Sequence, residues 1–130
     1  MQLNLTTDCA IRIVLYLATK KKVVNSNEIA KAMGIPSTYI MKITRTLKQA
    51  DILREKRGVD GGFVLNMEPE QLTLLEIVGA LEKTVNINRC LEEDEYCSRN
   101  AVTFCNVRKL LVRLQAELAE GLNVKISELI

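Results

Sequence analysis

Residues 25–65 read NSNEIAKAMGIPSTYIMKITRTLKQADILREKRGVDGGFVL, and this stretch decides the fold. Asn25 and Glu28 have the spacing of a capping box, which predicts a short helix ending at Met33. A Gly-Ile-Pro-Ser turn follows, and then a second helix is expected over residues 38–50. The apolar side chains of that helix recur at helical spacing: Ile40, Ile43 and Leu47. A short helix, a tight turn with glycine and a second helix predict a helix-turn-helix.

The residues after the second helix predict a β-wing. Residues 52–54 and 63–65 can pair as strands across the loop EKRGVDGG at residues 55–62. In a winged helix-turn-helix the second helix lies in the DNA major groove, and its first residues reach the bases. The candidate DNA-binding residues are Ser37, Thr38, Tyr39, Lys42, Arg45 and, at the wing tip, Arg57. The same pattern also suits a solvated basic face on an ordinary small helical domain.

Three further helices are expected around this segment. An apolar helix over residues 8–20 is capped by Thr6 or Thr7, and a capping box at Thr73 and Glu76 opens another. The last helix, over about residues 102–122, is longer than so small a domain needs, so a partner chain is expected to cover part of it. Its apolar repeat is Val107, Leu110, Leu111, Leu114 and Leu118. The predicted division is a DNA-binding domain at 1–82, a cysteine-bearing loop at 83–101 and a dimerisation helix with its tail at 102–130.

Composition narrows the function. The chain has 130 residues, a formal net charge of +2 and no histidine, which removes most acid–base and triad schemes and the commonest zinc ligand. Catalysis is therefore not expected. No signal-peptide pattern and no apolar run long enough to cross a bilayer is present, so a cytoplasmic location without membrane contact is expected. Disulfides are rare in that compartment, and its cysteines more often bind metal, react or lie buried.

Cys90, Cys97 and Cys105 form the second candidate site. They are separated by six and seven residues, which is wider than the cysteine pairs of tight zinc sites. Three thiolates are one short of the usual four ligands of an iron–sulfur cluster, so Cys9, a carboxylate, a small molecule or another subunit must supply the fourth. Spacing alone favours a metal or redox role no more than it favours a packed core thiol with two incidental cysteines.

The chain resembles the Rrf-two family of bacterial winged-helix transcriptional regulators, in particular its iron–sulfur cluster branch. The similar stretches are MQL at residues 1–3 with Thr7 and Asp8, IPSTYI at 35–40, RGVDGGF at 57–63 and LTLLEIVGALE at 72–82, followed by the three-cysteine loop and the long helix. The resemblance implies a homodimer in which Cys90, Cys97 and Cys105 hold the cluster. IscR-like members use a histidine at the position of Arg108, whereas NsrR-like members use an aspartate that corresponds to Asp8 of the partner subunit. The recognition helix carries Met41 where IscR-like members often have an acidic residue.

The sequence and the resemblance together lead to one main hypothesis. The chain is expected to be a mainly α, winged helix-turn-helix repressor that binds a double-stranded DNA operator as a homodimer. An iron–sulfur cluster, with [4Fe-4S] as the first expectation and [2Fe-2S] as the alternative, would sense nitric oxide, redox state or iron. The alternative regulator has no cluster, and Cys90 and Cys97 form a disulfide. A protein-interaction module that uses only the long helix is a third hypothesis.

Overall fold

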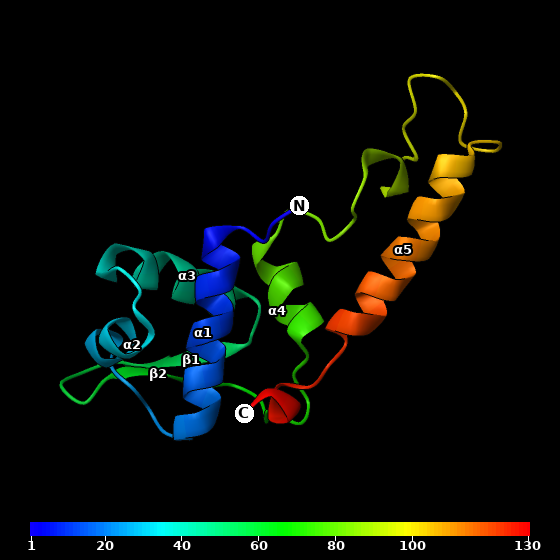
Figure 1. Ribbon diagram of the computed structural model, residues 1–130. Helices are drawn as coiled ribbons and strands as arrows, with labels where there is room; N and C mark the ends of the chain where they lie inside the picture. Colours follow the sequence, from blue (N-terminus) through cyan, green and yellow to red (C-terminus); the bar gives the residue numbers. More distant parts are fainter.

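The computed structural model describes residues 1–130 and has a mainly helical fold with one hairpin (Figure 1). Its elements are α1 (Leu5–Lys20), α2 (Ser26–Met33), α3 (Ser37–Gln49), β1 (Leu53–Lys56), β2 (Gly62–Leu65), α4 (Leu74–Leu81), the 3-10 turn η1 (Arg89–Leu91), α5 (Asn106–Leu122) and the 3-10 turn η2 (Ile126–Leu129). The predicted winged helix-turn-helix with a small hairpin wing is confirmed. None of these helices combines the length and the apolar character that a membrane span requires.

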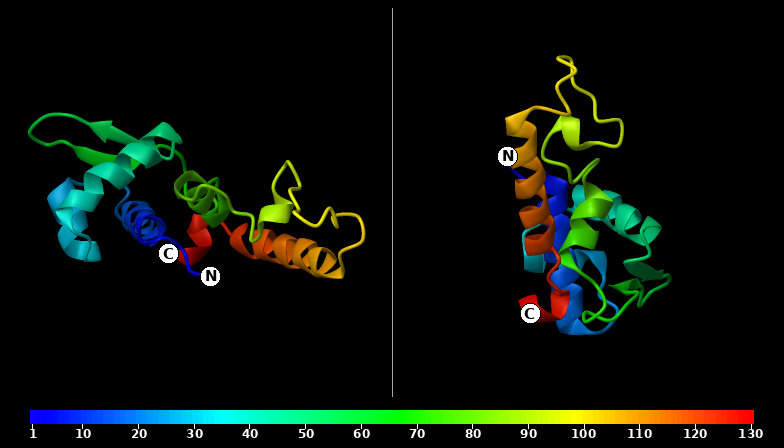
Figure 2. Two further views of the ribbon diagram at one scale, coloured as in Figure 1. Left: turned by 90° about the horizontal axis from the view of Figure 1, so that it is seen from above. Right: turned by 90° about the vertical axis from the view of Figure 1, so that its right-hand side faces the viewer.

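The chain folds into a body and an arm. The body contains α1 to α4 and the wing, with α1 packed against α2, α3, α4 and β2. The arm consists of α5 and the loop before it, and α5 packs on α4 and η1. In Figure 2 the arm extends to one side of the body and the wing to the other. The recognition helix and the cysteine loop therefore lie in different parts of the molecule.

Helix starts are set by side-chain caps, and two of the predicted caps are confirmed. The Asn25 side chain accepts the Glu28 N–H at 2.8 Å, and Thr73 forms a complete capping box with Glu76. The predicted start of the first helix was wrong, because α1 begins at Leu5. Asn4 is its cap and accepts the Thr6 N–H at 3.0 Å, which adds almost one turn to the helix.

The wing is a regular antiparallel pair that is fixed to the body at its base. Leu53 lies opposite Leu65, and Lys56 lies opposite Gly62. Phe63 is buried, and it exchanges two backbone hydrogen bonds with Val24 at 2.8 and 2.9 Å. Val24 thus forms an isolated antiparallel bridge beside β2, which joins the wing base to the core. The loop at residues 57–60 is exposed.

The C-terminal tail returns to the body. Ile126 is fully buried, and its N–H donates to the Leu72 carbonyl oxygen at 2.9 Å, next to an antiparallel bridge between Thr73 and Lys125. The turn η2 also packs against α1. The arm is therefore attached to the body at the end of α4 and again after α5.

The last helix starts later than predicted. It begins at Asn106 instead of Val102, because Ala101 is buried and Cys105 is the cap residue. The Cys105 sulfur accepts the Arg108 N–H at 3.4 Å. No residue of α5 is buried, and four members of the predicted apolar repeat are exposed: Val107, Leu110, Leu114 and Leu118.

Candidate DNA interface and thiol site

The first turns of α3 present polar side chains to solvent. The helix buries Ile40, Ile43, Thr44 and Leu47 against the body, and this anchoring turns the opposite side outward. Five of the six predicted DNA-binding residues are exposed: Ser37, Thr38, Lys42, Arg45 and Arg57. Tyr39 is half-buried and packs against the core cluster. The structure thus makes the predicted face available, and Tyr39 has a packing role as well.

The wing and α3 enclose an open groove of about 290 Å³. Met41 lies on the α3 side of this groove, and Lys56 and Arg57 lie on the wing side. Gly58 has a φ of +107°, which lets the chain turn at the tip and leaves Arg57 exposed. A helix face of the kind that enters the major groove therefore lies next to an exposed cationic tip.

The three predicted ligand cysteines line one open cavity of about 440 Å³ between η1, the following loop and the start of α5. Each is partly exposed and none forms a disulfide. Cys9 is different: it is 2% exposed and belongs to the core of the body. Cys9 has the environment of a packed core thiol, whereas the other three cysteines share a solvent-accessible site.

N–H groups surround these sulfur atoms. The Asn88 side-chain amide donates to the Cys90 sulfur at 3.2 Å, and the Arg108 N–H donates to the Cys105 sulfur. Backbone N–H groups of Ala101 and Arg99 hold the pKa of the Cys97 thiol below its ordinary value. The N–H donors at Cys97 favour its thiolate form, which is the form that binds metals and reacts with oxidants.

Two arginines hold the loop around the cavity. Arg89 forms a bidentate ion pair with Asp94, and its guanidinium lies 5.3 Å from the centre of the Tyr96 ring. Arg108 donates to the Cys90 carbonyl oxygen and to the Glu95 carboxylate, both at 3.2 Å. Arg108 therefore connects α5 to both sides of the acidic loop.

The structure does not bring Asp8 to the cysteines of its own chain. Asp8 lies in the first turn of α1, is 46% exposed at its side chain and pairs with Arg12. It is absent from the lining of the cysteine cavity. A role for Asp8 at this cavity therefore requires a second copy of the chain.

The side-chain chemistry of the cavity suits an iron–sulfur cluster, since three thiols line it and such a cluster usually has four ligands. No three possible metal-binding side chains converge on one point, as a single bound ion would require. A polynuclear cluster has a less strict requirement, because each cysteine binds a different iron atom. The three thiols on one cavity, with N–H donors around their sulfur atoms, are the pattern that such a group needs.

The residues that shape this cavity were not predicted from the sequence. No sequence motif contains Asn88, Arg89 or Arg108. The sequence predicted no contact for Arg108. Arg89 lies five residues before Asp94, and Asn88 lies two residues before Cys90. These short separations are a weak local signal, since a loop that folds back brings such pairs together.

Comparisons with known proteins agree with this architecture. Residues 3–130 match the Rrf2 family model, which is described as an iron-dependent transcriptional regulator. The HTH-type transcriptional regulator NsrR of Bacillus subtilis is 30% identical over 97 residues, which is 73% of this chain and 66% of that protein. NsrR of Bacillus licheniformis is 28% identical over 114 residues, or 85% of this chain and 78% of that protein. The match therefore spans just under two thirds of the first relative.

Two solved structures share the fold. IscR of T. potens has a TM-score of 0.79 at 17% identity and covers 99% of this chain and 85% of its own. The global cysteine regulator CymR of B. subtilis has a TM-score of 0.80 at 23% identity, with 99% and 95% covered. The named relatives are regulators and not enzymes. Because the family model spans nearly the whole sequence, the chain belongs to the Rrf2 (Rrf-two) family of transcriptional regulators.

Proposed function

We propose that the chain is a DNA-binding repressor whose operator affinity is set by an iron–sulfur cluster on Cys90, Cys97 and Cys105. The observation that supports it is the single cavity lined by three partly exposed thiols, outside the body that carries the recognition helix. The proposed division of labour is DNA binding by residues 1–82, sensing by 83–101 and dimerisation by 102–130. As a regulator of DNA, the protein would act in the cytoplasm.

The cysteines lie where ligation would connect separate elements. Cys90 and Cys97 belong to the loop, and Cys105 is the cap of α5, so shared ligation ties the loop to that helix. A bound cluster, [4Fe-4S] or [2Fe-2S], would supply the chemistry that responds to nitric oxide, oxidants or iron supply. Asp8 of the partner subunit is the proposed fourth ligand, and release from Arg12 would free its carboxylate for that role.

A second copy of the chain is the proposed partner of α5. The apolar side chains on one face of this helix are exposed. Burying apolar surface is favourable by about 25 cal/mol per Å², so covering this face with a partner would stabilise the complex. A homodimer would cover this face and would place two recognition helices on one duplex. When the cysteines lose their common ligand, the helices can change spacing and lose register with half-sites about one helical turn apart.

The alternative function is a regulator with a thiol–disulfide switch. Cys90 and Cys97 line the same cavity, and the lowered pKa of Cys97 favours its nucleophilic form. Hydrogen peroxide would accept two electrons and two protons from the two thiols. Its oxygen–oxygen bond would break to give two water molecules, and a sulfur–sulfur bond would form. CymR of Staphylococcus aureus, which has the same fold at 17% identity, has been solved in an oxidised form.

Anaerobic purification distinguishes the two functions. Iron and acid-labile sulfide are measured in the wild type, Cys97→Ser and Cys9→Ala, and operator binding is measured on the same samples before and after nitric oxide. We expect iron and sulfide in the wild type and in Cys9→Ala, their loss in Cys97→Ser, and weaker DNA binding after nitric oxide.

Other outcomes contradict the cluster. Protein that stays iron-free after reconstitution, and whose DNA affinity changes with peroxide and returns with dithiothreitol, would establish the thiol switch. Equal DNA affinity in every form would contradict both kinds of sensing, and the absence of DNA binding at low salt would contradict the repressor itself.

A further inference from the structure

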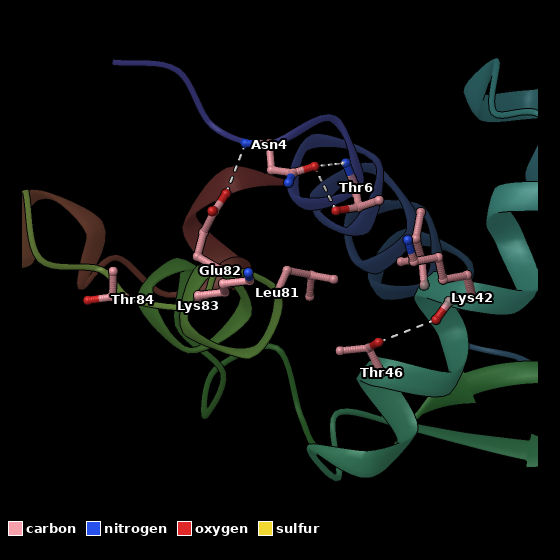
Figure 3. Close-up of a pocket in the computed structure, with 9 residues that line it drawn as sticks. Asn4, Thr6, Lys42, Thr46, Leu81, Glu82, Lys83 and Thr84 are labelled. Carbon is pink, nitrogen blue, oxygen red and sulfur yellow. Dashed lines mark hydrogen bonds between the residues drawn. The ribbon is translucent and has the colours of Figure 1, made fainter.

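A second open cavity, of about 350 Å³, lies on the side of α3 that faces away from the wing (Figure 3). It is lined by Lys42 and Thr46 of α3, by the start of α1 at Asn4, and by the end of α4 at Glu82 and Lys83. Met41, one residue away on α3, belongs to the groove on the wing side instead. The recognition helix therefore has a hollow on each of its two flanks.

Two cations face this cavity without an acidic partner. Lys42 and Lys83 are exposed, and neither takes part in any of the five ion pairs of the chain. The hydroxyl groups of Thr46 and Thr6 already have acceptors, because Thr46 donates to the Lys42 carbonyl oxygen and Thr6 donates to the Asn4 side chain. The two ammonium groups are thus the cationic donors that the cavity leaves available.

The one carboxylate in the lining, that of Glu82, is hydrogen-bonded to the first residues of the α1 region. Glu82 accepts the Asn4 N–H at 2.9 Å and the Thr7 hydroxyl at 2.7 Å through the same oxygen. These hydrogen bonds turn it toward α1, as Figure 3 shows for its contact with Asn4. They also hold the start of α1 against the end of α4, which fixes the wall on which Lys83 lies.

The position of the cavity indicates its ligand. A helix in the major groove lies between two phosphate backbones, about 12 Å apart across the groove. Lys56 and Arg57 of the wing are available to one backbone, and Lys42 and Lys83 lie on the opposite flank. We propose that this cavity receives a backbone phosphate of the operator, with Lys42 and Lys83 as its cations. This inference rests on the proposed DNA-binding function and adds Lys83, which lies outside both the helix-turn-helix and the wing.

The proposed phosphate contact of Lys83 would depend on the position of the arm. Lys83 lies two residues after the end of α4, and the next residues lead into the loop. There the Asn86 side chain donates to Glu92 at 3.0 Å, and Gln115 of α5 donates to the Val85 carbonyl oxygen at 2.9 Å. A change in the arm therefore moves the connection that carries Lys83. Phosphate contact at this cavity links the DNA-bound state to the state of the cysteine loop.

The salt dependence of DNA binding tests the proposal. Affinity for a duplex selected by the wild type from a random pool is measured between low and moderate salt for the full-length wild type, Lys83→Gln and Lys83→Arg. Each phosphate contact contributes about 0.9 to the slope of log affinity against log salt. Lys83→Gln removes one contact from each subunit of the proposed dimer, so we expect it to reduce the slope by about 1.8 and to weaken binding equally on all duplexes, whereas Lys83→Arg keeps the slope.

A matched control and a free anion complete the experiment. Lys109→Gln removes the same charge from an exposed position on α5 and should leave the slope unchanged. An unchanged slope in Lys83→Gln, while the wild type binds DNA normally, would overturn the inference and leave the proposed function intact. Inorganic phosphate is titrated without DNA while the melting temperature is followed. Stabilisation that Lys83→Gln abolishes, combined with an unchanged slope, would assign the cavity to a free anion and also overturn the inference.

Discussion

Glu82 illustrates how one side chain joins helices that are distant in the sequence. Its carboxylate accepts hydrogen bonds from Asn4 and Thr7, more than seventy residues earlier. The Thr7 hydroxyl and the Asn4 N–H lower the pKa of Glu82, because both hydrogen bonds favour its ionised form. The position of α1 against α4 therefore depends on the charge of this residue.

Replacing Glu82 by glutamine should lower the free energy of unfolding by about 1 kcal/mol at neutral pH, since a neutral acceptor forms weaker hydrogen bonds and the site is only partly buried. A lowered folded-state pKa stabilises the protein above the ordinary glutamate pKa, and this contribution is lost as pH falls through the lowered value. The difference between the wild type and Glu82→Gln should therefore shrink on acidification, as measured by urea unfolding from pH 7 to pH 3. Glu120→Gln, at an exposed position on α5, is the control, and a pH-independent difference would contradict the prediction.

Which residues could be assigned from the sequence depended on how local their partners are. Asn25 and Thr73 were correctly predicted as caps, because each bonds a group three residues away. Thr7 was taken as a possible cap of α1, but its hydroxyl reaches Glu82 instead. No sequence pattern predicts a hydrogen-bond partner 75 residues away. The residue that caps α1 is Asn4.

At the scale of elements, the wing depends on close approach of its base to the loop after α1. A β-carbon on Gly62 would lie 2.2 Å from the Val24 carbonyl oxygen, which is too close for any side chain. Gly79, in α4, has nothing within 4 Å of the corresponding position. The two glycines therefore have opposite roles, although both lie inside regular elements.

A pair of alanine substitutions tests this contrast. Gly62→Ala should lower the free energy of unfolding by about 1–3 kcal/mol, because the bridge between Val24 and Phe63 must open to admit the methyl group. Gly79→Ala should raise it by about 0.5–1 kcal/mol, since alanine loses less backbone entropy in a helix. Chemical denaturation measures both variants, and equal effects of the two would show that the wing base is not tightly packed.

The elements themselves were largely predictable, and their ends were less so. The two wing strands were placed within two residues, because short apolar stretches flank a glycine-rich loop. The start of α5 was placed four residues too early. Residues 102–105 continue the apolar pattern, but the buried Ala101 fixes a turn there and Cys105 ends it as the cap.

On the scale of the whole molecule, α5 has an apolar face that the single chain does not cover. Leu114, near the middle of this face, is 39% exposed. Leu114→Glu should convert the proposed dimer to a monomer, because a charge at the centre of an apolar interface is costly to bury. Analytical ultracentrifugation measures the change. Ala116→Glu places the same charge on the other side of the helix and should remain dimeric, and a dimeric Leu114→Glu would place the interface elsewhere.

Features that combine residues from distant segments could not be predicted from the sequence. Ile126 is fully buried against residues near Leu72, yet the tail is too short to show any periodicity. The cavity at Lys83 draws on the first residues of α1, on α3 and on the end of α4, so its members share no motif. The cysteine cavity was easier to anticipate, because cysteine is a rare residue whose chemistry is visible in any context.

The return of the tail to the body has a mechanical consequence. The chain passes from body to arm after Glu82 and passes back before Ile126, so the arm is mounted at two points. A segment attached at one point can rotate in every direction, whereas a segment attached at two points can rotate only about the line that joins them. At 1.5 Å per residue, α5 is about 25 Å long, and a swing of 10° moves its far end by about 4 Å. The cysteines lie at that far end, so we expect a small change there to rotate the arm about this line without loosening its two attachments.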